Sequence, residues 1–154
     1  MIEALASFAS TVLVGLLSAW VGVLFSLKRY RSEKWWEKKV EAYERIINAL
    51  HATKNFNDKH FDAGVEGEKI SDVDDQKLMS EAEKGHNEIL RTIDIGSFLL
   101  PESSVNRLKQ FAADVNKINS EAESWDEYLD RDWKVTKECL EDLKILAKRD
   151  LKID

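Results

Sequence analysis

The sequence is poor in the residues that build cross-links, tight turns and β-rich folds. Its 154 residues include one cysteine, one proline and six glycines. The single cysteine, Cys139, excludes a disulfide within the chain and is typical of a reducing compartment. With so few turn-forming residues and 34% charged residues, the composition favours helices over a turn-rich β fold.

The motifs that usually signal an enzyme are also missing. The sequence has no glycine-rich phosphate loop, no nucleophile elbow and no zinc-ligand spacing. Glu83 and His86 have the spacing of one half of a di-iron site, but neither His51 nor His60 has a glutamate three residues before it. A histidine near the core explains His86 better, and a structural thiol explains Cys139. We therefore predict that the protein is not an enzyme.

Charge is absent from one long stretch, residues 4–27. A helix of that length spans about 36 Å, enough to cross a hydrocarbon core of about 30 Å. A cleaved signal peptide would need a basic segment before the run and small residues after it, whereas Lys28 and Arg29 follow. A soluble helix is rarely apolar around its whole circumference. The sequence therefore predicts a transmembrane anchor over residues 1–27.

Basic residues fix the predicted orientation of this anchor. Lys28, Arg29, Arg31 and Lys34 follow the run, and only Glu3 precedes it. Because basic residues stay on the cytoplasmic side, we expect the amino terminus outside and residues 28–154 in the cytoplasm. The predicted topology is a single pass through the lipid bilayer.

Small residues recur every three or four positions along the same run: Ser7, Thr11, Gly15, Ser18, Gly22 and Ser26. Such a stripe lets two membrane helices approach closely. We therefore expect a homo-oligomer, although small residues are also simply common in membrane spans.

Apolar residues at helical spacing predict four helices in residues 28–154. The first continues from the membrane to about residue 57, and a long loop with Gly64 and Gly67 follows over residues 58–71. The others cover about 72–93, 102–122 and 125–151, with the last two joined into one helix as an alternative. Gly96 suits a left-handed cap, and Phe98, Leu99 and Leu100 are expected to close the end of the core. The predicted fold is all-α, a transmembrane helix continuing into a cytoplasmic four-helix bundle.

Charge divides the predicted cytoplasmic part unevenly. Residues 28–45 hold seven basic and four acidic residues, whereas residues 46–154 hold sixteen basic and twenty-four acidic ones. The basic segment belongs beside anionic lipid headgroups. The acidic remainder argues against double-stranded nucleic acid as a partner, because such a partner needs a broad basic face.

Polar residues gather where the first helix is expected to end. Donors that suit a phosphate or a nucleobase surround Phe56 there: His51, Lys54, Asn55, Asn57, Lys59 and His60. Arg91 and Arg107, near the opposite helix junction, form a second group of candidates. A solvated helix end is the alternative explanation for the first group, and composition alone favours it.

Residues 28–50, KRYRSEKWWEKKVEAYERIINAL, resemble a group of small bacterial single-span membrane proteins. Shared features are the membrane run, the Trp-Trp-Glu-Lys-Lys core at residues 35–39 and the Ala-Tyr pair at residues 42–43. The layout is similar to a CRISPR-associated membrane effector that binds cyclic tetra-adenylate through its cytoplasmic domain. That resemblance implies antiviral defence, in which the second messenger assembles the soluble domain and disturbs the inner membrane. It assigns no ligand residues, because no shared motif lies beyond residue 50.

Two other functions stay open at this point. One is a non-catalytic membrane adaptor that recruits a cytoplasmic protein partner. The other is a metal-dependent oxidase built on Glu83 and His86, which has only half of the required motif.

Overall fold

The computed structural model describes residues 2–153, and it describes side chains for residues 18–96 and 98–153. Regular structure within residues 2–153 is entirely helical: α1 (Ile2–Glu66), α2 (Asp72–Ile95), the short 3-10 helix η1 (Gly96–Phe98), α3 (Glu102–Glu121) and α4 (Trp125–Leu151). The predicted all-α class is therefore confirmed over the described residues. The chain forms two compact units, Met1–Lys38 and Lys39–Asp154.

The first unit is the N-terminal part of α1. Its large apolar side chains are exposed from residue 20 onward, including Trp20 at 62% and Phe25 at 69%. Among the residues whose side chains are described, no helical window is long and apolar enough to cross a membrane. Residues 1–14, 16 and 17 are not among them. Side chains are therefore described for only part of the predicted span over residues 4–27, and the span stays a prediction.

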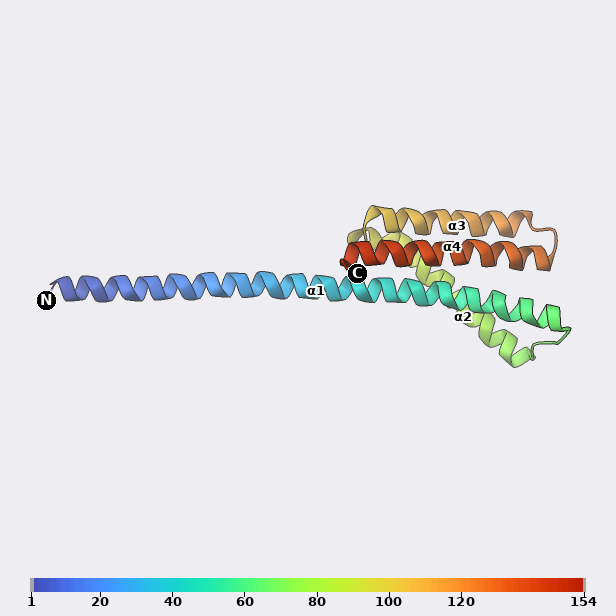
Figure 1. The fold of residues 1–154 in the computed structure, drawn as a ribbon, viewed down its shortest axis with the longest axis horizontal. Coiled ribbons are helices and arrows are strands. Elements are labelled where there is room, and N and C mark those ends of the chain that lie inside the picture. Colours follow the sequence, from blue (N-terminus) through green and yellow to red (C-terminus); the bar gives the residue numbers. More distant parts are fainter. Residues whose placement is uncertain (1, 154) are drawn as a thin grey trace. The chain divides into compact units, whose positions relative to one another are not determined.

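The second unit is a bundle built from the C-terminal part of α1 and from α2, α3 and α4 (Figure 1). Helices α3 and α4 run antiparallel beside each other, and the Arg107 guanidinium of α3 donates to Asp142 of α4 at 2.7 Å. Helix α1 contacts both: Tyr43 shares a 2.9 Å hydrogen bond with Ser104, and Lys39 pairs with Asp150 at 2.7 Å. The prediction of a four-helix bundle is confirmed for this unit.

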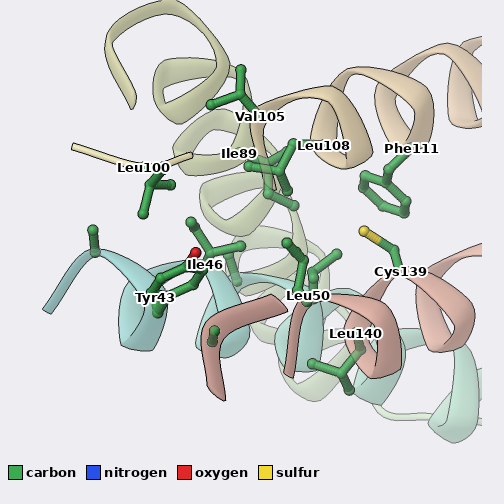
Figure 2. Close-up of a cluster of buried hydrophobic side chains, with 14 of the residues drawn as sticks. Tyr43, Ile46, Leu50, Ile89, Leu100, Val105, Leu108, Phe111, Cys139 and Leu140 are labelled. Carbon is green, nitrogen blue, oxygen red and sulfur yellow. The ribbon is translucent and has the colours of Figure 1, made fainter. Parts of the chain in front are cut away.

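The core lies where the four helices of the bundle meet. Figure 2 shows Ile46 and Leu50 of α1 and Ile89 of α2 in one cluster with side chains of α3 and α4. The apolar stripes of α3 and α4 are mostly buried, with Val105, Leu108, Ala112, Val115 and Ile118 on α3 and Leu129, Thr136, Leu140, Leu143 and Ala147 on α4, whereas Trp133 of α4 is half-buried. The helical spacing also predicts burial of Trp36 on α1 and of Leu78, Ala82 and Ile93 on α2, but Trp36 is 48% exposed and the other three are half-buried. Gly85 brings α2 close to α1, since a Cβ there would lie 2.6 Å from the carbonyl oxygen of Ala49.

Helix α1 is longer than predicted. It ends at Glu66 rather than near residue 57, so the loop covers only residues 67–71. Gly67 adopts φ +68, and the amide of Glu68 donates to the carbonyl of Ala63 at 3.0 Å, the pattern of a glycine-terminated helix. Gly64 stays helical, and contacts of residues 56–60 with α2 and α4 stabilise the extra turns.

The end of α2 also differs from expectation. Gly96 is right-handed, with φ −72, so the predicted left-handed cap is wrong. A Cβ at Gly96 would lie 2.9 Å from Cγ2 of Thr92, so close packing explains this glycine. Leu100 is buried and closes the core as expected, whereas Phe98 is 74% exposed and does not.

Serine side chains cap the starts of α2 and α4. Oγ of Ser71 accepts the amide of Asp74 at 3.2 Å, and Oγ of Ser124 accepts the amide of Glu127 at 3.2 Å. Glu127 also accepts the amide of Glu123 at 3.1 Å. The break between α3 and α4 is therefore real, and the alternative of one continuous helix is wrong.

Candidate functional site

A cleft of about 320 Å³ opens between the four helices of the bundle. Its volume lies at the lower end of the range for small-molecule sites. Every helix contributes polar or aromatic side chains: Thr53 and Phe56 from α1, Glu83 and His86 from α2, Phe111 and Asn119 from α3, and Trp125, Tyr128 and Asp132 from α4.

Asp132 is the most unusual group in the cleft, because it is a carboxyl group that is only 2% exposed. Its Oδ2 accepts a hydrogen bond from Nδ2 of Asn57 at 2.7 Å. Burial raises the pKa of Asp132, while the hydrogen bond from Asn57 and the charge of His86 act in the opposite direction. Asp132 therefore binds its proton more tightly than an exposed aspartate does, and as a carboxylate its oxygens accept hydrogen bonds.

Several polar atoms around Asp132 are buried without a hydrogen-bond partner among the described residues. They are Oδ1 of Asp132, Oδ1 of Asn57, and Oγ1 of Thr136, one turn further along α4. A buried polar atom without a partner costs about 1–3 kcal/mol, so such atoms are rare away from functional sites. A ligand that bonds to Asp132 would remove part of this cost.

Aromatic rings line the mouth of the cleft. Trp125 stacks on Tyr128 with 5.3 Å between ring centroids, and Phe56 meets the edge of Trp125 at 6.2 Å. Burial and the nearby charge of Asp132 raise the pKa of Tyr128, which keeps its hydroxyl protonated. Flat rings beside a carboxyl group suit a planar ligand whose edge carries N–H or O–H donors.

The cleft holds little that would do covalent chemistry. Cys139 does not line the cleft, and burial raises its pKa to about 12, which leaves a thiol rather than a nucleophilic thiolate. Glu83 and His86 both line the cleft, but the described residues contain no cluster of His, Cys, Asp or Glu that could hold a metal ion. The arrangement can bind and orient a ligand.

The predicted residues from 51 to 60 lie on a helix, and they therefore point in different directions. His51 is exposed, and Asn55 and Lys59 line a separate hollow facing α2. Lys54 pairs with Asp58, and Nε2 of His60 lies 3.0 Å from Oδ1 of Asp75. Asn57 bonds to Asp132, and the ring of His60 contacts Phe56 at 4.3 Å. The structure brings only these two predicted residues near the cleft.

The predicted arginines lie elsewhere, and each has a carboxylate partner. Arg91 contacts Glu88 at 3.3 Å on α2, and Arg107 contacts Asp142 at 2.7 Å. Neither side chain lines the cleft. Arg91 and Arg107 are therefore not brought together with residues 51–60 into one pocket.

Sequence reasoning missed Asp132, although the sequence holds a signal for it. Asp132 lies three residues after Leu129 and four before Thr136, on the apolar stripe of α4. A carboxylate on a buried stripe is rare unless it is paired or functional. No comparable pattern in the sequence predicts that Trp125, Tyr128 and Asn119 line the cleft, because their positions there depend on how α1, α3 and α4 pack.

Comparisons with known proteins assign no function to the cleft. No family model, no curated protein and no solved structure matches the chain.

Proposed function

We propose that this protein is a non-catalytic membrane-anchored effector, in which the bundle binds a small-molecule signal and residues 4–27 act in the inner membrane. The observation that carries the proposal is the charge-free run of residues 4–27, followed at once by Lys28, Arg29 and Arg31. This pattern supports a single pass with the amino terminus outside and the bundle in the cytoplasm.

The ligand class comes from the resemblance of residues 28–50 to single-span membrane proteins and to a CRISPR-associated effector. In this proposal the ligand is a cyclic oligoadenylate, and the function is bacterial antiviral defence. One adenine ring would stack near Trp125 and Tyr128, with its hydrogen-bonding edge at Asp132. The cleft itself is lined by two carboxyl groups and one imidazole, so the phosphates would need cations from an interface between two copies.

Ligand binding is tested with the full chain in a mild detergent. Thermal unfolding and oligomer mass are measured with and without cyclic tetra-adenylate, and with adenosine as a ligand without phosphates. We expect cyclic tetra-adenylate to stabilise the bundle, by about 2.7 kcal/mol at one hundred times its dissociation constant, and to raise the oligomer mass.

A matched pair of variants locates the effect. Trp125→Ala removes a ring from the cleft, and Trp36→Ala removes the same ring type from the other compact unit. The stabilisation should be weaker in Trp125→Ala and unchanged in Trp36→Ala. No thermal or mass response to cyclic tetra-adenylate in the unmodified chain would reject the nucleotide as ligand.

A second function, the membrane adaptor, is favoured by the charges of the bundle. Acidic residues outnumber basic ones in residues 46–154, and Lys54, Arg91 and Arg107 all have carboxylate partners. Such a surface suits a basic protein better than a polyanion. Co-purification of one stoichiometric protein partner, with no response to any nucleotide, would decide for the adaptor.

A further inference from the structure

A second cavity, of about 240 Å³, lies between α1 and α4. Its apolar walls come from Phe61, Leu129 and Trp133, and three carboxylates surround them, Asp58, Asp62 and Asp130. The described residues contain no cluster of acidic residues arranged to hold a metal ion. Apolar walls with spaced carboxylates suit an organic cation better than a bare ion.

The cavity has an excess of negative charge. Asp58 is already engaged, since it pairs with Lys54 and accepts a 2.6 Å hydrogen bond from Nε1 of Trp133. Within the part of the chain that the structure describes, neither Asp62 nor Asp130 forms an ion pair, and both line the cavity. Two carboxylates therefore remain for a cationic ligand.

Asn57 supplies an independent reason to expect a ligand. It is only 1% exposed, it lines this cavity, and its Nδ2 is committed to Asp132 at 2.7 Å. Its Oδ1 is buried without a partner among the described residues. A carbonyl oxygen accepts but does not donate, so the missing partner is an N–H or O–H group.

The indole ring of Trp133, in the wall of this cavity, already makes cation–π contacts. The ammonium groups of Lys137 and Lys54 lie 4.9 and 5.5 Å from its ring centroid. Both distances fall within the range in which a positive charge is attracted to an indole face. A ligand ammonium beside Asp62 and Asp130 would meet the same kind of surroundings.

We propose that the cavity between α1 and α4 binds a small organic cation with N–H donors, a primary ammonium or a guanidinium group. The cation lies between Asp62 and Asp130 and donates to Oδ1 of Asn57, while its carbon chain contacts Phe61 and Leu129. Asn57 connects this cavity to the cleft around Asp132 through its hydrogen bond to that carboxyl group, but the cation site does not depend on the proposed nucleotide.

The test is a titration of the full chain in detergent, followed by the NMR signal of the Trp133 side-chain N–H. The probes are butylammonium, tetramethylammonium, which has no N–H donor, and neutral pentanol. We expect saturable binding of butylammonium, weaker binding of tetramethylammonium and no binding of pentanol. Equal binding of pentanol and butylammonium would overturn the proposal.

Charge-removing variants show whether the binding belongs to this cavity. Asp62→Asn with Asp130→Asn should weaken butylammonium binding about tenfold, since two partly solvated carboxylates are lost. Glu138→Gln removes an exposed charge from α4 outside the cavity and should leave the affinity unchanged. Circular dichroism checks that each variant is folded. Unchanged affinity in the double variant, or an equal loss in Glu138→Gln, would refute the assignment.

The same ammonium group can come from a free amine or from a lysine of another protein. A lysine flanked by alanines in a capped tripeptide is therefore compared with 1,4-diaminobutane. Tighter binding of the peptide indicates a protein partner, and tighter binding of the diamine indicates a free polyamine. Failure of both probes, and of butylammonium, would refute the site itself.

Discussion

Helix α1 contains two apolar stretches that meet opposite surroundings. In the first unit, Trp20, Val23 and Phe25 are 55–69% exposed. In the second unit, Tyr43, Ile46 and Leu50 are at most 2% exposed. The same helix therefore exposes its apolar side chains in one unit and buries them in the other.

The arrangement of the polar residues explains the difference. In residues 42–50 the apolar side chains occupy one stripe, and Glu44, Arg45 and Asn48 are exposed on the other side. In residues 18–27 the apolar side chains surround the whole helix, and the polar residues are only Ser18 and Ser26. A single apolar stripe is removed from water by packing against neighbouring helices, whereas a helix that is apolar all round is removed from water only in an apolar solvent.

The largest contrast is expected from shortening a leucine in each stretch. Leu50→Ala empties a fully buried position and should lower the free energy of unfolding of the bundle by about 3 kcal/mol. Leu24→Ala shortens a side chain that is 46% exposed and should change that free energy by less than about 0.5 kcal/mol. Urea unfolding of the full chain in detergent measures both. Equal losses would mean that the two stretches do not differ as described.

Glycine substitutions extend the comparison to helix packing within the bundle. Gly85→Ala places a Cβ 2.6 Å from the carbonyl oxygen of Ala49 and should cost about 2 kcal/mol through overpacking. Gly64→Ala meets nothing within 4 Å and should stabilise α1 by up to about 1 kcal/mol. Thermal unfolding compares the two variants. A stable Gly85→Ala protein would show that α1 and α2 are not in close contact.

The small residues of the first unit should matter for association but not for folding. A Cβ at Gly15 or Gly22 meets nothing within 4 Å, so Gly15→Leu with Gly22→Leu should leave the bundle's melting temperature unchanged. Self-association in lipid vesicles should weaken by about 1–2 kcal/mol, roughly tenfold, if the stripe is the contact face. Energy transfer between labelled copies reports it. Unchanged transfer would leave residues 4–27 as a simple anchor.

The smallest effect concerns the pH dependence of the bundle. The pKa of Asp132 is raised in the folded state above its ordinary value of 3.8, so the folded state binds its proton more tightly than the unfolded state. Stability linked to this group is therefore complete below about pH 3.8 and decreases as the pH rises through the folded-state pKa.

Asp132→Asn keeps an acceptor for Asn57 and removes the titration. The variant should be more stable than the parent near neutral pH, by about 1 kcal/mol, and lose this advantage at low pH. Urea unfolding across the pH range measures the difference. A pH-independent difference would show that Asp132 titrates as an ordinary exposed carboxyl group does.

Local signals predicted much of the bundle from sequence. Ser71 and Ser124 mark the starts of α2 and α4, because a serine oxygen at that position accepts an amide that the helix leaves without a partner. The apolar stripes of α3 and α4 identified their buried faces. These features depend on residues three or four positions apart, so they can be predicted from a single sequence.

Features that depend on distant residues could not be predicted in the same way. Helix α1 passes residue 57 because Asp58 and His60 meet Trp133 and Asp75, which are remote in sequence. Gly96 is needed for packing against Thr92 rather than for a left-handed turn. The polar residues of 51–60 form a cluster in sequence, but the helix distributes them around its circumference, and only Asn57 and His60 approach the cleft.

The central proposal is that residues 4–27 lie in a bilayer, whereas the apolar side chains of residues 42–50 lie in a protein core. The most direct test is alkaline carbonate extraction of membranes from cells that produce the full chain. We predict that the protein stays with the membrane pellet, as an integral membrane protein does. Release of the folded protein into the supernatant would contradict the claim.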